Sequence, residues 1–153
     1  MARSPVEVVQ AILANPTDPE IVDALVAPVA TYVSLNYDNP DLKRIVPWTG
    51  THRGPRSISS TFKSVGEYWG SQAFEIEALF GSEENVAVFG RFTFKSNTLG
   101  KTATSPFSIF AKVRDGKVVY MQFMEDTFAT AATFHAGGAW TFRSDPQGGE
   151  VQI

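Results

Sequence analysis

The chain has 153 residues, which is the length of one domain with enough chain to bury a core. A net charge of -3, a pI near 5.3 and the lack of any Lys/Arg cluster argue against nucleic-acid binding. There is no cysteine, which excludes a disulfide framework and a thiolate metal site. No apolar run reaches the ~20 residues of a membrane span, and residues 1–15 lack the apolar core of a signal peptide. We therefore expect a cytoplasmic protein that binds neither nucleic acid nor a membrane.

Two helix starts lie close together near the N-terminus. Ser4, Pro5 and Glu7 form a capping-box pattern, and Asp18 followed by Pro19 begins a second, shorter helix. Residues 30–35 are β-prone and predict a first strand. Residues 36–54 contain several prolines and glycines and show no period, which is typical of a lid, a binding loop or a disordered segment.

The second half of the chain predicts one helix followed by strands. Residues 55–69 place Ile58, Phe62, Val65 and Trp69 at helical spacing. The expected strands are residues 73–80, 86–95, 102–113 and 118–126, and residues 127–135 form a short last helix. Helices first and antiparallel strands afterwards predict an α+β domain over residues 1–136. Residues 137–153 are expected to form a tail that is partly docked.

The run from Val118 to Asp126 ends in two adjacent carboxylates that must point to opposite faces of a regular strand. A two-residue turn at Asp115-Gly116 would place Ser105 opposite Asp126 and Phe107 opposite Met124. Burial in such an apolar strip favours the neutral form of a carboxyl, which suits a general acid or base. Asp126 is therefore the candidate catalytic residue, with Glu125 pointing outward. The alternative is that Asp126 caps the helix that begins near Thr127.

Several other residues are candidates for the same site. His52 lies in the long loop and could relay protons, although it could equally be an exposed loop histidine. No metal-ligand spacing or phosphate-binding loop is present, so no cofactor is expected. The apolar face carrying Phe110, Met121 and Phe123 predicts a homodimer. The side chains expected to contact a small hydrophobic ligand are Tyr32, Ser34, Asn36, Trp48, Trp69, Ser105, Phe107, Gln122 and Met124.

The order and spacing of four segments resemble the nuclear-transport-factor-like superfamily, and within it the SnoaL-like and ketosteroid-isomerase-like proteins. These segments are residues 18–25, 30–33, 50–55 and 113–126. The resemblance implies three N-terminal helices packed on a strongly curved, mostly antiparallel sheet, which forms a cone-shaped cavity (a cystatin-like α+β barrel). Proteins of this kind take small, often hydrophobic molecules and commonly form homodimers through the outer face of the sheet.

The resemblance implies less about chemistry. Ser34 stands where ketosteroid isomerases have their aspartate base, and Gln10 stands near their tyrosine. Asp126 matches the acid/base aspartate of SnoaL-like polyketide cyclases. Two hypotheses follow: a cofactor-independent isomerase, cyclase or dehydratase that uses Asp126, or a non-catalytic binding or accessory dimer in which Asp126 is a helix cap.

Overall fold

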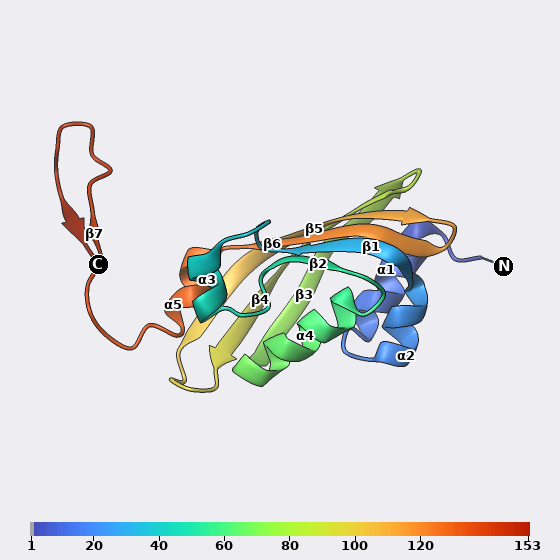
Figure 1. Ribbon diagram of the computed structural model, residues 1–153, viewed down its shortest axis with the longest axis horizontal. Coiled ribbons are helices and arrows are strands. Elements are labelled where there is room, and N and C mark those ends of the chain that lie inside the picture. Colours follow the sequence, from blue (N-terminus) through green and yellow to red (C-terminus); the bar gives the residue numbers. More distant parts are fainter. Residues whose placement is uncertain (1) are drawn as a thin grey trace.

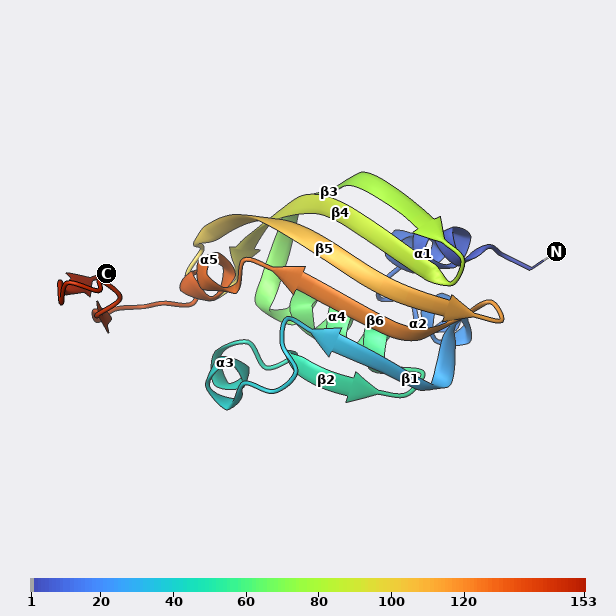
Figure 2. The same ribbon diagram turned by 90° about the horizontal axis from the view of Figure 1, so that it is seen from above.

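A computed structural model of the chain describes residues 2–153 and shows an α+β fold, as predicted. A six-stranded sheet curves strongly, and helices cover one of its faces (Figure 1). The strand order is β2-β1-β6-β5-β4-β3, in which β1 and β6 run parallel and the other neighbours are antiparallel. The sheet is not closed into a barrel, because β2 and β3 remain its edges (Figure 2). The strands are β1 (Val26–Ser34), β2 (Gly50–Arg53), β3 (Trp69–Ser82), β4 (Asn85–Ser96), β5 (Thr102–Arg114) and β6 (Lys117–Glu125).

The helices begin at the caps that the sequence predicts. The Ser4 side chain accepts from the Glu7 backbone N–H at 3.2 Å, and the Glu7 carboxylate accepts from the Ser4 N–H at 2.7 Å. The Asp18 side chain caps the next helix by accepting from the Glu20 backbone N–H at 2.9 Å. None of the helices in residues 2–153 is long and apolar enough to cross a bilayer. The helices are α1 (Pro5–Ala14), α2 (Pro19–Val22), the 3₁₀ turn η1 (Asp23–Leu25), α3 (Pro40–Ile45), α4 (Ser57–Tyr68) and α5 (Thr127–Ala132).

The expectation of a structureless loop over residues 36–54 is wrong in part, because this segment contains α3 and the edge strand β2. The Asn39 side chain caps α3 by accepting from the Leu42 N–H at 3.0 Å. Strand β2 exists because it pairs with β1, with Ser34 opposite Gly50. Elements of six and four residues are too short to show a period, so tertiary pairing rather than pattern determines them.

The predicted register of the β5–β6 hairpin is wrong by one residue. The turn at Asp115-Gly116 forms as expected, and Arg114 pairs with Lys117. A bulge follows, because Val113 pairs with Val118 whereas Lys112 pairs with Tyr120, which leaves an extra residue in β6. A one-residue slip moves every later side chain to the other face of the sheet. From this point on, the odd-numbered residues of β6 face the helices.

Residues after α5 leave the body of the protein. They form a short hairpin of β7 (Thr141–Phe142) and β8 (Val151–Gln152), which is a separate two-stranded sheet. The hairpin stands away from the six-stranded sheet, at the end opposite to α1 (Figures 1 and 2). We call residues 139–153 the C-terminal arm.

Candidate active site

The bulge in β6 brings Glu125, rather than Asp126, to the helix-covered face of the sheet. Glu125 is the last residue of β6 and pairs with Phe107 of β5. Phe123 and Met121 precede it on the same face, and both are buried. The carboxyl group therefore sits at the end of an apolar strip.

Glu125 borders a small internal cavity of about 30 Å³, which is room for about one water molecule. Most of its wall is aromatic, and hydroxyl groups supply most of the remaining polar surface. The lining residues come from β1, α4, β3, β4 and β6 and from the segment before β2. They are Tyr32, Ser34, Trp48, Thr61, Phe62, Val65, Trp69, Phe74, Phe94, Phe123 and Glu125.

Electrostatics single out Glu125 within this wall. Its Oε2 atom is fully buried and accepts no hydrogen bond from residues 2–153. Burial raises the pKa of this carboxyl from the usual 4.5 to about 7; the hydroxyl of Thr130 lowers it and the charge of Asp126 raises it. The same environment holds the pKa of the Tyr32 phenol well above its ordinary value, through burial and the neighbouring Glu125. Near neutral pH the cavity therefore holds a carboxyl that exchanges a proton readily and a phenol that stays neutral.

Stacked rings hold the aromatic wall in place. The Trp48 and Trp69 rings meet edge to face at 4.8 Å, and the Trp69 Nε1–H donates to the Thr133 hydroxyl at 2.9 Å. On the other side, Phe107 stacks between Phe74 at 4.7 Å and Phe123 at 5.3 Å. Aromatic pairs at such distances are favourable beyond the area that they bury. These contacts fix the aromatic rings of the wall relative to one another.

The placement predicted for Asp126 is wrong. Its carboxylate is exposed and caps α5, with Oδ1 accepting from the Ala129 N–H at 3.1 Å. The β6 bulge is the reason, because it turns Asp126 away from the face that Glu125 occupies. The nearness of Ser105 is correct, but the contact runs through the backbone: the Asp126 N–H donates to the Ser105 hydroxyl at 2.9 Å. The geometry is that of the helix-cap alternative.

Four of the predicted ligand-contacting residues, Tyr32, Ser34, Trp48 and Trp69, line the cavity. Their role in binding stays a prediction. Phe107 lies one layer behind the wall, against Phe74 and Phe123.

Other predicted residues lie outside the lining. The Asn36 side-chain amide is buried without a hydrogen-bond partner in residues 2–153. The Ser105 hydroxyl donates to the Pro106 carbonyl. His52 is half-buried, and its Nε2 donates to the Trp48 carbonyl at 2.7 Å.

Gln122 and Met124 point to the outer face of the sheet, so their predicted placement beside the cavity is wrong. The β6 bulge accounts for both. The Gln122 side chain accepts from the Tyr120 hydroxyl at 2.9 Å, and Met124 is exposed.

The lining residues that sequence reasoning missed are Glu125, Phe123, Thr61, Phe62, Val65, Phe74 and Phe94. Phe62 and Val65 were recognised as the apolar side of α4, but nothing in their spacing separates a core from a cavity wall. Phe74 and Phe94 show ordinary strand alternation. Only the bulge reveals Glu125, and a bulge has no reliable local signal here.

Comparison with known proteins agrees with this fold. Residues 9–121 match the sequence family described as the SnoaL-like domain. The chain belongs to the SnoaL-like family. It is 44% identical over 153 residues to patulin synthesis protein F of Aspergillus clavatus and 40% identical over 153 residues to patulin biosynthesis cluster protein F of Penicillium expansum. Each alignment covers 96% of this chain and 77% of the relative.

Solved structures with the same SnoaL-like architecture include an NTF2-like protein from Burkholderia thailandensis. It is 24% identical, with a TM-score of 0.73 over 87% of this chain and 98% of that chain. TerC, crystallised with polyporic acid, is 25% identical, with a TM-score of 0.69 over 86% of this chain and 98% of that chain. These structures confirm the fold.

Proposed function

We propose that this SnoaL-like protein binds a small, largely planar hydrophobic molecule in the aromatic cavity and moves a proton on it with Glu125. The observation that carries the proposal is the buried Oε2 of Glu125, which has no hydrogen-bond partner in residues 2–153 and belongs to a residue that lines the aromatic cavity. Burying a polar group without a hydrogen bond is costly, and such cost is typically retained where the group has a task.

A carboxyl with a pKa of about 7 can act in both directions near neutral pH. In its neutral form it donates a proton to an oxygen of the ligand, and in its ionised form it takes a proton from carbon or oxygen. Tyr32 and Ser34 contribute neutral hydroxyls beside it, which orient an oxygen of the ligand by hydrogen bonding. Isomerisation, cyclisation and dehydration all require only such proton transfers, so this chemistry is a cofactor-independent lyase or isomerase type.

The relatives support a role in the biosynthesis of a small molecule. Two of them carry names that place them in patulin synthesis, and TerC was crystallised with polyporic acid. The 44% identity over 96% of this chain supports a shared class of ligand with these relatives.

Ligand entry requires the cavity to widen, because about 30 Å³ is too small for an organic molecule. Phe74 is the lining residue suited to this movement. It stands on the edge strand β3, its side chain is 37% exposed, and β3 carries an irregularity between Ser71 and Ala73. Rotation of the Phe74 ring toward solvent would open the wall beside Phe107.

The second candidate is a non-catalytic binding or accessory protein. The favouring observation is that Glu125 is the only carboxylate, histidine or lysine among the lining residues. A reaction that needs two separate acid/base groups would have no second one in this wall.

We also propose a homodimer through the outer face of the sheet, and the residues predicted for it need correction. Met121 and Phe123 face the core, as the bulge dictates. Phe110 does lie outward and is 39% exposed, together with Phe89 and Met124. An apolar patch of this kind on a sheet face is typical of an interface.

Complementation tests the role of Glu125. A Penicillium expansum strain that lacks its cluster protein F would receive that protein with its matched segment replaced by this chain. We expect the parent chain and Asp126→Asn to restore patulin and Glu125→Gln to reduce it by roughly 10²–10⁴-fold. Equal restoration by Glu125→Gln would contradict proton transfer by Glu125. Calorimetry with naphthoquinone, a neutral planar probe, then measures affinity in both proteins. Unchanged affinity in Glu125→Gln together with lost patulin assigns the loss to proton transfer, whereas unchanged affinity together with full restoration of patulin favours the binding protein.

A further inference from the structure

The C-terminal arm has one apolar and one polar face. Phe142 pairs with Val151, and the backbone groups of Trp140 and Ile153 bond to each other at 2.7 and 3.0 Å. Alternation along each strand therefore places these four side chains on a single face. The opposite face is polar: Gln152 donates to the Thr141 hydroxyl, and Arg143 pairs with Glu150 at 2.9 Å.

The apolar face of the arm is largely uncovered within one chain. Trp140, Val151 and Ile153 are 52%, 53% and 58% exposed. The aromatic contact between the arm and the body is that of Trp140 with Phe128, at 6.3 Å between ring centroids. A two-stranded hairpin is marginal by itself in water, and alternation of this kind is typical of a sheet that packs one face on a partner.

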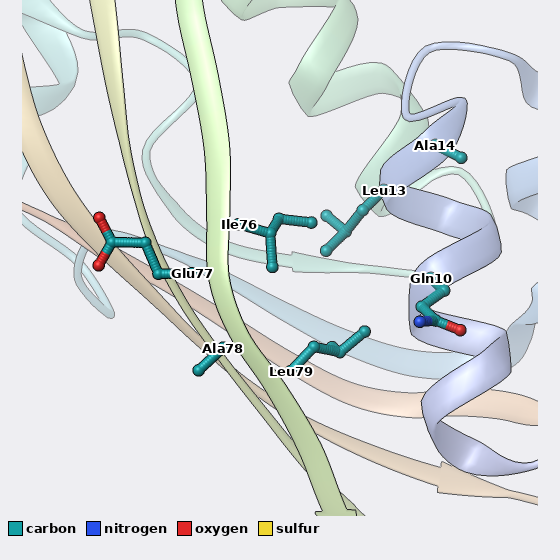
Figure 3. A pocket seen from close by; sticks show the side chains of 7 residues that line it. All are labelled: Gln10, Leu13, Ala14, Ile76, Glu77, Ala78 and Leu79. Carbon is teal, nitrogen blue, oxygen red and sulfur yellow. The ribbon is translucent and has the colours of Figure 1, made fainter.

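A matching apolar groove lies between α1 and β3, at the other end of the molecule. Its volume is about 440 Å³, and Figure 3 shows Ile76 and Leu79 of β3 pointing toward α1 and Leu13 of α1 pointing toward β3, whereas Glu77 and Ala78 point away from the helix. The apolar side chain of Ile76, on the β3 side of the groove, is 44% exposed in the single chain. The groove, which we call the α1–β3 groove, is lined by Gln10, Leu13, Ala14, Ile76, Glu77, Ala78 and Leu79.

The arm and the α1–β3 groove of one chain lie at opposite ends of the sheet (Figures 1 and 2). The arm therefore cannot fill its own groove without a large rearrangement. A second copy removes this obstacle: a two-fold axis that lies beside the sheet and runs across its strands exchanges the two ends, so the arm of each chain extends toward the groove-bearing end of its partner.

We propose that the apolar face of the C-terminal arm docks in the α1–β3 groove of a second copy of this chain. Each arm offers on the order of 300 Å² of exposed apolar surface, given the size of its aromatic and branched side chains. Two arms and the two surfaces that cover them then bury about 1,200 Å², which is the lower bound of a specific interface. Because β3 is an edge strand, the docked arm also shields its free backbone groups.

Disulfide trapping between two different chains tests this inference cleanly, because the protein has no cysteine of its own. Val151→Cys is made in one chain, and Ala14→Cys is made in a second chain that carries a size tag. Both sites are exposed, so folding is expected to be unaffected. The matched control pairs Val151→Cys with Thr98→Cys, an exposed position in the turn between β4 and β5.

After mixing and mild oxidation, we expect the tagged heterodimer from Val151→Cys and Ala14→Cys to form at least ten times faster than the control. Ile76→Cys, on the β3 side of the groove, should behave like Ala14→Cys. Equal rates for groove and control would overturn the proposal. So would an intramolecular disulfide in the Val151→Cys/Ala14→Cys double variant, because that product would show the arm folding onto its own chain. Neither result depends on the role of Glu125.

Discussion

The buried carboxyl of Glu125 should make the stability of this protein depend on pH in a defined direction. Its pKa is about 7 in the folded protein and near 4.5 in the unfolded chain, so the folded state binds more protons between these two values. The free energy of unfolding contributed by this group is therefore highest below pH 4.5 and falls as the pH rises toward 7. A tenfold difference in proton affinity is worth about 1.4 kcal/mol, so the loss is on the order of 3 kcal/mol.

The perturbation is Glu125→Gln, which keeps the shape of the side chain and removes its ionisation. Urea unfolding followed by tryptophan fluorescence at pH 4.5 and pH 8.5 gives the free energy of unfolding of each variant. We expect the free energy of unfolding of the variant, relative to that of the parent, to be about 3 kcal/mol higher at pH 8.5 than at pH 4.5. All other titrating groups are shared by the two proteins, so their contributions cancel in this comparison.

The matched control is Asp126→Asn, on the neighbouring carboxylate. Asn is as good a helix cap as Asp, and the charge of Asp126 is the smallest of the causes that shift the pKa of Glu125, so this variant should keep most of the parent's loss of stability between the two pH values. The reasoning would be refuted if Glu125→Gln and the parent lost stability in parallel. That result would mean that the Glu125 carboxylate reaches water in the folded protein and is not desolvated by the aromatic wall.

Two further predictions concern the wall and the outer face. Gly90→Ala should destabilise the protein by about 3 kcal/mol in urea unfolding, because a Cβ there would overlap the Glu75 carbonyl and the Phe107 ring; Gly66→Ala, in open space on α4, should be neutral or slightly stabilising. Phe110→Glu should convert the proposed dimer to a monomer in light scattering across a dilution series, whereas Leu99→Ser should leave the mass unchanged. A dimer that persists in Phe110→Glu would contradict an interface at this position of the outer face.

Local signals in the sequence determined much of this fold. The capping box at Ser4 and the Asp-Gly turn at Asp115 each act over a few residues, and each is present where the pattern predicts it. The succession of helices followed by antiparallel strands then restricts the architecture to helices on a sheet. These features need no knowledge of distant contacts, which is why they can be read directly.

Local signals do not determine which acid lies in the cavity, because the answer depends on a single extra residue in β6. Side chains alternate along a strand, so one bulge exchanges Glu125 and Asp126 between the two faces of the sheet. The sequence shows two adjacent carboxylates at the end of an apolar strand, and it is equally consistent with either facing inward. Only the pairing of β6 with both β5 and β1 decided that Glu125 meets the aromatic wall while Asp126 caps α5.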